Sequence, residues 1–311
     1  MPLSPEGRAI LNRADELGLL GAELDTVDEL RDAHQRQRDL MGEAASVARV
    51  EQGRVRGPDG SIPVRIYAPP GEPPFPVIVF YHGGGWVLGT LDDADIDCRE
   101  LCLEIGAVVV SVAYRLAPEH RFPAGLLDAY AGFRWSIEYA GRFGGAPSVV
   151  AVGGDSAGGN LAAAIAVVAA DRAERRPDLA LLIYPPTDCA RTTESYSKFA
   201  RGYFLEEEDM RWFWDQYTEG AHCADPRASI LRSDASTQPP TVILTAEYDV
   251  LRDEGESWGR RLAEAGVPVH LARCDGAVHG FWSYGRVAPR ARAWAMAEIR
   301  NGMLELGFLR P

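Results

Sequence analysis

The order of apolar and polar positions divides the chain into two parts. Through residue 45 the apolar positions recur at helical spacing, with Ile10, Ala14 and Leu17 on one face. Thr26 and Glu29 form a capping-box pattern that predicts the start of a second helix. From about residue 47 short apolar runs alternate with helical patterns, and we predict strands at 62–67, 77–81, 107–112, 149–152, 179–184, 242–246 and 267–271.

β-Branched runs separated by helices are typical of a mostly parallel sheet with helices on both faces. The sequence therefore predicts an α/β fold. The runs at 62–67 and 77–81 have no helical pattern between them, so we expect these two strands to be antiparallel.

The interval 187–238 interrupts this alternation, because it contains no clear strand pattern. It has an acidic stretch at 206–209, followed by an aromatic cluster at 212–217. We interpret the interval as a helical insertion over the sheet. Packing against the core and contact with a substrate explain the aromatic cluster equally well, since insertions after strands tend to carry functional sites.

Composition and charge narrow the function. The 311 residues are 46% apolar and 25% charged, which is ordinary for a globular enzyme. Lys and Arg number 32 against 45 Asp and Glu, a net charge of −13 that disfavours nucleic acid and anionic membrane surfaces as partners. No apolar stretch approaches the roughly 20 residues of a membrane span, and the charged N-terminus lacks the apolar core of a secretory signal.

The cysteines favour a reducing compartment. There are five, scattered at positions 98, 102, 189, 223 and 274, and we expect free thiols in a cytoplasmic protein. Cys98 and Cys102 would share a helix face, and with no second pair to complete a metal site we interpret them as small buried residues.

A G-x-S-x-G motif at 154–158 places Ser156 between a strand pattern and a helical pattern. In this motif the serine occupies a strained turn, and the glycines on either side avoid clashes there. A second match at 255–259 contains Ser257, but no strand leads directly into it and its surroundings have a charged helical pattern. We therefore predict Ser156 as a nucleophile and assign Ser257 to a surface helix.

The segment His82-Gly-Gly-Gly-Trp86 follows the predicted strand at 77–81. A glycine run at a strand end lets backbone N–H groups approach a ligand, so it can form an oxyanion hole, with another donor from Ala157 after the nucleophile. The alternative is a flexible turn without chemistry. We expect His82 to fix the loop rather than act as a base.

A nucleophilic serine needs a base and an orienting carboxylate. Of the histidines after Ser156, His279 lies in a loop past the last predicted strand, whereas His270 falls in the strand and His222 in the insertion. Three carboxylates, at positions 247, 249 and 253, follow the strand at 242–246. Position alone favours Asp249 without excluding Glu247 or Asp253.

Five motifs together resemble the bacterial branch of the hormone-sensitive-lipase family of esterases. They are HGGGW at 82–86, YRLAPEHRFPA at 114–124, GDSAGGN at 154–160, EYDVLRDEG at 247–255 and VHGF at 278–281, in the order and spacing of that family. The resemblance extends from about residue 45 to the C-terminus. Val250 departs from the proline that is frequent at its position, a change that should affect loop stiffness rather than the triad.

The resemblance implies an α/β-hydrolase fold with a helical cap. The cap would comprise residues 1–45 and the insertion 187–238, and the core would comprise 46–186 and 239–311. The family pattern implies Ser156, Asp249 and His279 as triad, an oxyanion hole from Gly83, Gly84 and Ala157, and no metal or organic cofactor. Trp86, Trp212 and Phe213 are expected to contact substrate.

We therefore predict a cytoplasmic serine carboxylesterase for esters of short to medium acyl chains. Its partners would be a small-molecule ester and, as a homodimer, a second copy of the chain. An amide hydrolase or an acyltransferase could use the same triad, and sequence does not separate them. A non-catalytic binding protein, like the plant gibberellin receptors that lack the catalytic histidine, is disfavoured because His279 is present.

Overall fold

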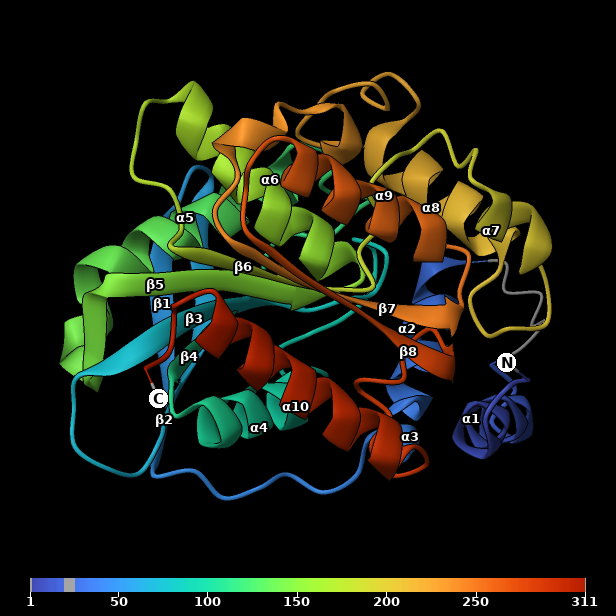
Figure 1. The fold of residues 1–311 in the computed structure, drawn as a ribbon, viewed down its shortest axis with the longest axis horizontal. Coiled ribbons are helices and arrows are strands. Elements are labelled where there is room, and N and C mark those ends of the chain that lie inside the picture. The colour runs from blue at the N-terminus through green and yellow to red at the C-terminus, as the bar shows by residue number, and fades with distance from the viewer. Residues whose placement is uncertain (1, 20–25, 311) are drawn as a thin grey trace.

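The computed structural model describes residues 2–19 and 26–310, and this part of the chain contains an eight-stranded sheet between layers of helices (Figure 1). The strands are β1 (Arg49–Gly57), β2 (Gly60–Ala68), β3 (Phe75–Tyr81), β4 (Val108–Val112), β5 (Gly145–Asp155), β6 (Leu179–Ile183), β7 (Thr241–Tyr248) and β8 (Val269–Val278). Their order is β1-β2-β4-β3-β5-β6-β7-β8. The β1–β2 and β2–β4 pairs are antiparallel, and the other pairs are parallel.

Helices cover both faces of the sheet, as Figure 1 shows. One face carries α5 (Ala124–Tyr139), α6 (Ala157–Asp171) and α9 (Arg252–Glu264). The other carries α1 (Pro5–Glu16), α4 (Asp95–Ile105) and α10 (Pro289–Glu305). Cys98 and Cys102 are buried in α4 as free cysteines, in agreement with their interpretation as core residues.

The two faces have separate apolar cores because side chains alternate along each strand. In β3, Val77 and Val79 belong to the core under α5 and α6, whereas Ile78 and Phe80 belong to the core under α4 and α10. A strand that is buried on both faces therefore has the uninterrupted apolar run that the sequence showed.

Further helices lie over the carboxyl ends of the parallel strands. They are α2 (Val27–Arg36), α3 (Arg38–Met41), α7 (Glu194–Lys198) and α8 (Glu207–Thr218). Short 3₁₀ turns lie elsewhere, at Ala140–Phe143 before β5 and at Ile230–Arg232 and Ala235–Thr237 before β7. The capping box predicted at Thr26 and Glu29 begins α2. The described insertion 187–238 contains helices and turns but no strand, as expected.

The seven predicted strands are present, with two differences. β1 was not predicted, because its alternating residues leave only Val55 buried. β8 continues to Val278, well beyond the apolar run that ended at 271. β2 and β3 run in opposite directions, as expected, but β4 lies between them, so they are not neighbours.

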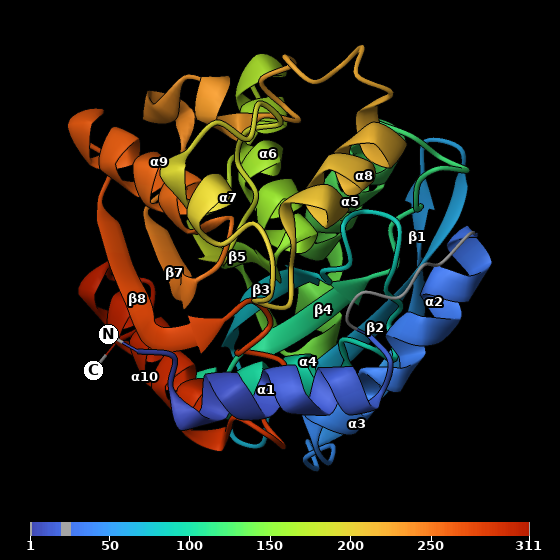
Figure 2. The same ribbon diagram turned by 90° about the vertical axis from the view of Figure 1, so that its right-hand side faces the viewer.

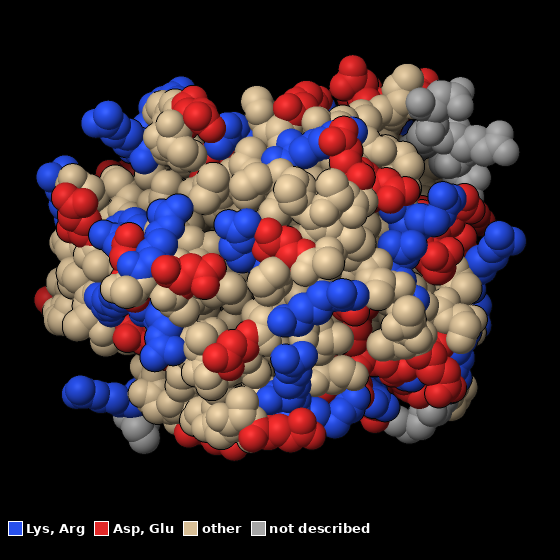
Figure 3. Space-filling view, turned by 90° about the horizontal axis from the view of Figure 1, so that it is seen from above, with Lys and Arg blue, Asp and Glu red and all other residues tan. Residues whose placement is uncertain are grey.

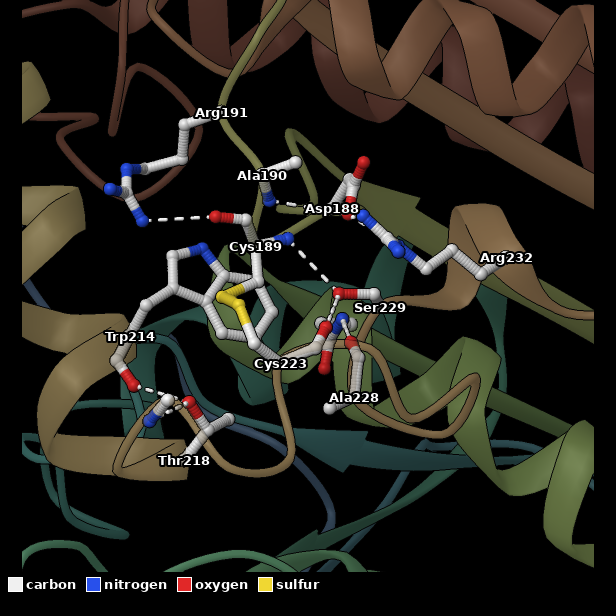
Figure 4. The surroundings of a disulfide bond; sticks show 12 residues. Asp188, Cys189, Ala190, Arg191, Trp214, Thr218, Cys223, Ala228, Ser229 and Arg232 are labelled. Atoms are coloured by element: carbon white, nitrogen blue, oxygen red, sulfur yellow. Dashed lines mark hydrogen bonds and ion pairs between the residues drawn. A yellow bond between two sulfur atoms is a disulfide. The ribbon is translucent and has the colours of Figure 1, made fainter.

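The expectation of five free thiols is wrong. Cys189 and Cys223 form a disulfide within the insertion, with Cα atoms 5.5 Å apart (Figure 4). Ser229 joins the two ends, because its hydroxyl accepts from the N–H of Cys189 at 3.0 Å and donates to the carbonyl of Cys223 at 2.6 Å. The loop before α7 is therefore tied to the loop after α8.

The first helix begins beside the carboxyl end of β8, where the N–H of Ser4 donates to the carbonyl of Gly276. α1 packs beside β8 and α10 near the bottom of Figure 2, with Ile10 and Ala14 fully buried there. The Glu6 carboxylate accepts from the N–H groups of Arg290 and Ala291 at the start of α10, where the helix dipole favours a negative charge. Of the segment 1–45 that was expected in the cap, the residues that line the cavity described below belong to α2, α3 and the position between them, and none belongs to α1.

The face shown in Figure 3 carries charged side chains of both signs. On the face in Figure 3 basic residues lie among acidic ones, so the net negative charge does not form a single field there. Within the described residues, no helix has the length and apolarity needed to cross a membrane.

Candidate active site

The carboxyl ends of neighbouring parallel strands bring the predicted site residues together. The glycine run at 83–85 follows β3, Ser156 follows β5, Asp249 follows β7 and His279 follows β8. This is the edge where open α/β sheets bind ligands.

Ser156 lies in a sharp turn between β5 and α6. Its φ of 50° is unusual for a residue with a side chain, and such strain is typical of a nucleophile turn. A Cβ on Gly158 would overlap the carbonyl of Tyr81, and one on Gly154 would meet the backbone of Gly158. These close approaches explain why glycine occupies both positions of the motif.

Hydrogen bonds connect Ser156, His279 and Asp249 in a row. The Ser156 hydroxyl lies 3.1 Å from Nε2 of His279, whose Nδ1 lies 2.7 Å from Oδ2 of Asp249. Asp249 is fully buried, and its other oxygen accepts from the N–H of Leu251 at 2.9 Å. With Nδ1–H donating to Asp249, the neutral ring presents Nε2 to the serine as an acceptor.

The other candidate carboxylates, and the serine of the second G-x-S-x-G match, make their contacts outside this row. Asp253 accepts from the N–H of Ser195 at the start of α7, and Glu247 accepts from the N–H of Gly276. Ser257 lies in α9 and donates to the carbonyl of Asp253, as its assignment to a helix predicted. His270 is on β8, between Glu298 and Glu305.

The glycine loop after β3 corrects the predicted set of oxyanion donors. The N–H of Gly83 donates to Oδ1 of Asp155 at 2.8 Å, so it is already engaged. Among the described residues, nothing accepts from the N–H groups of Gly84, Gly85 or Ala157. Gly84 and Gly85 also have positive φ values, 105° and 58°, which glycine adopts without strain.

His82 fixes this loop. Its Nδ1 lies 2.8 Å from the carbonyl of Gly83, and its ring stacks on Tyr114, whose hydroxyl donates to the His82 carbonyl. Burial lowers the pKa of His82 to about 4, so the ring is neutral at pH 7 and carries no charge into the site.

A cavity of about 140 Å³ contains Ser156 and His279. Its apolar wall comes from the cap and the neighbouring loop, with Met41, Leu88, Phe204, Leu205 and Phe213. α2 is held over it by Arg31, which donates to the carbonyl of Val87 and pairs with Glu119.

Of the three residues predicted to contact substrate, one lines the cavity and two do not. Phe213 lines the cavity and lies directly against Gly85. Trp86 is buried between Trp214 and Tyr217, at ring distances of 4.5 and 4.4 Å, and is outside the cavity lining, as is Trp212. The motif could not show this difference, because it depends on which way each ring turns.

The polar part of the cavity was not predicted. It includes Asp155, Tyr184 and His34, which come from β5, the end of β6 and α2. Burial, together with the nearby Asp97 carboxylate, raises the pKa of Asp155 to about 7. The position of Asp155 inside the serine motif was the one available signal. Among the described residues, no group of three or more metal-binding side chains is present.

The sheet order, the strained serine after β5 and the hydrogen-bonded row with His279 and Asp249 define an α/β-hydrolase of the serine type. Comparison with known proteins agrees: residues 78–283 match the family model described as alpha/beta hydrolase fold.

Two curated relatives are named as ester hydrolases. The chain is 46% identical to carboxylic ester hydrolase LipN of Mycobacterium tuberculosis over 235 residues, which are 73% of this chain and 62% of LipN. It is 40% identical to carboxylesterase NlhH of the same species over 271 residues, 85% of each chain. Among solved structures, a hyperthermophilic esterase from Pyrobaculum calidifontis matches with TM-score 0.92 and 36% identity, over 99% of this chain and 100% of that one.

The chain therefore belongs to the α/β-hydrolase fold family, in its hormone-sensitive-lipase-like group.

Proposed function

We propose that Ser156, His279 and Asp249 of this carboxylic ester hydrolase form a catalytic triad that works through an acyl-enzyme. The observation that carries the proposal is the hydrogen-bonded row at 3.1 and 2.7 Å, inside a cavity and beside unpaired backbone N–H groups.

In the first half-reaction the Ser156 hydroxyl attacks the ester carbonyl carbon while its proton passes to Nε2 of His279. The oxygen that becomes negative is stabilised by the N–H groups of Gly84, Gly85 and Ala157, with Ala157 at the N-terminus of α6. His279 then gives its proton to the departing alcohol. Water attacks the acyl-enzyme in the same way, which releases the acid and restores the serine.

The size of the cavity supports a preference for short acyl groups. An engineered apolar cavity of about 150 Å³ holds one benzene molecule, that is, six carbon atoms. The cavity here, at about 140 Å³, accommodates a group of similar size.

The oligomeric state and the cellular location of the enzyme stay predictions. A homodimer is one of them, and sedimentation of the purified enzyme tests it. A cytoplasmic location is the other, and the Cys189–Cys223 disulfide speaks against the reducing compartment from which it was inferred.

The nucleophile is tested with a panel of acetate to octanoate esters, together with an anilide and an alcohol acceptor for the amidase and acyltransferase alternatives. Ser156→Ala should lower ester turnover by about 10⁶, to the level that binding and the oxyanion hole leave. Ser257→Ala, in α9, is the matched control and should retain turnover. Equal losses in the two variants would reject Ser156.

The same ester panel tests the role of Asp249 as the carboxylate that orients His279. Asp249→Asn should lower turnover by about 10⁴, because the amide favours the wrong tautomer of His279. Glu247→Gln and Asp253→Asn are the comparison variants, and a larger loss in either of them would move the role away from Asp249.

A further inference from the structure

The lining of the active-site cavity contains polar groups, although an apolar acyl chain would not need them. Asp155, Tyr184 and His34 are among them, and apolar residues such as Met41 and Leu88 line the same cavity. None of the three takes part in the row Ser156–His279–Asp249, and only Asp155 has another role there, in holding the glycine loop through Gly83.

These groups have unused hydrogen-bonding capacity. Among the described residues, the buried Tyr184 Oη and His34 Nδ1 make no hydrogen bond of regular geometry, although Ser283 lies near the first and Gln37 near the second. Asp155 spends one carboxylate oxygen on the N–H of Gly83, and no described group donates to the other, Oδ2. A buried polar group without a good hydrogen bond destabilises the protein, so a ligand that supplies the missing bond gains binding energy.

The backbone holds Tyr184 in place for such a contact. The residue directly follows β6, has a φ of 38° and is 1% exposed. Its ring centroid lies 4.4 Å from that of His279. A group bound by Tyr184 is thus close to the reacting ester.

We propose that the enzyme, acting through the triad proposed above, prefers esters that carry a hydroxyl group within about six non-hydrogen atoms of chain beside the scissile bond. A hydroxyl both donates and accepts, so it can donate to Asp155 and accept from Tyr184. A carboxylate substituent could not donate to Asp155 and would place a second negative charge beside it whenever Asp155 is ionised.

The test compares esters in which a hydroxyl replaces a methyl group of similar size. Ethyl 3-hydroxybutyrate against ethyl 3-methylbutyrate varies the acyl side, and 2-hydroxyethyl acetate against propyl acetate varies the alcohol side. In the native enzyme the hydroxylated ester of one pair should have a kcat/KM about tenfold higher, as one well-made buried hydrogen bond gives. The favoured pair shows whether the acyl side or the alcohol side of the ester reaches Asp155 and Tyr184.

Variants of the polar cavity residues test whether these residues cause the preference for hydroxylated esters. Tyr184→Phe should reduce the ratio of kcat/KM within the favoured pair by about five- to tenfold, since only the hydroxyl is removed. Tyr196→Phe is the matched control, because Tyr196 also has a buried, unpartnered hydroxyl but does not line the cavity, and its ratio should equal that of the native enzyme. Asp155→Asn, which keeps an oxygen for Gly83 but replaces an acceptor with a donor, should also lower the ratio.

Ratios at or below one in both native pairs would overturn the proposal, as would a ratio that Tyr184→Phe and Asp155→Asn leave unchanged. Either result leaves the triad standing as long as Ser156→Ala abolishes hydrolysis of the methyl-bearing esters. Hydrolysis that survives Ser156→Ala would instead refute the proposed mechanism.

Discussion

Asp155 is the residue at which the nucleophile turn and the glycine loop meet. Its carboxylate fixes Gly83, and its neighbours include Asp97, His279 and Tyr184. The sequence indicated Ser156, Asp249 and His279 because each follows a strand end and belongs to a motif, and in the structure the three side chains lie within hydrogen-bond distance in a row. It could not show that Gly83 donates to Asp155, because that depends on the direction of one N–H group.

The raised pKa of Asp155 predicts a pH-dependent contribution to stability. Burial favours the protonated form in the folded state, so this contribution is full below the unfolded pKa near 4 and is lost as pH rises through about 7. Asp155→Asn removes the titration. We expect thermal midpoints measured from pH 4 to 8 to show the variant gaining relative to the native enzyme as pH rises. A constant difference across this range would contradict the raised pKa.

At the level of elements, the central strands could be predicted and the edges could not. β3, β4 and β6 are almost entirely apolar, and β5 and β7 contain an apolar central run, because both faces of the sheet are covered there. β1 is an edge strand with mostly exposed residues, and the part of β8 after residue 271 contains Arg273, Asp275 and Gly276, so neither produces an apolar run. Partners that the insertion brings together from distant positions, such as Cys189 and Cys223, leave no local pattern at all.

The disulfide should stabilise the insertion. It closes a loop across 34 residues that includes α8 and hence Phe213 at the cavity, beside Trp214 (Figure 4). Reduction or Cys223→Ser should lower the free energy of unfolding by about 2–4 kcal/mol, since the unfolded chain regains freedom. Denaturant unfolding with and without reductant measures this.

Cys223→Ser also serves as the control. Because this variant cannot form the disulfide, reductant should not lower its free energy of unfolding further. Titration of the unfolded, unreduced native protein should find thiols only at the three free cysteines, Cys98, Cys102 and Cys274. Five titratable thiols, or a native protein indifferent to reductant, would show that the pair is not bonded.

At the scale of the whole molecule, the N-terminal region has two separable tasks. α1 closes the core beside β8 and α10, whereas α2 and α3 form a wall of the cavity through His34, Gln37 and Met41. Periodicity in the sequence showed that these helices have apolar faces. It could not show which surface each face covers, because that is decided by the strands and helices they meet.

Two truncations separate these tasks. Removing residues 1–19 deletes α1, which buries Ile10 and Leu11 but contributes nothing to the cavity lining, so we expect a thermal midpoint lower by roughly 5 °C or more and an unchanged acyl-chain profile. Removing residues 1–41 also opens the cavity wall and should shift the optimum toward longer acyl chains. Identical profiles for the two truncations would mean that α2 and α3 do not limit the acyl group, and its size would then be set by Phe213 and the rest of the insertion.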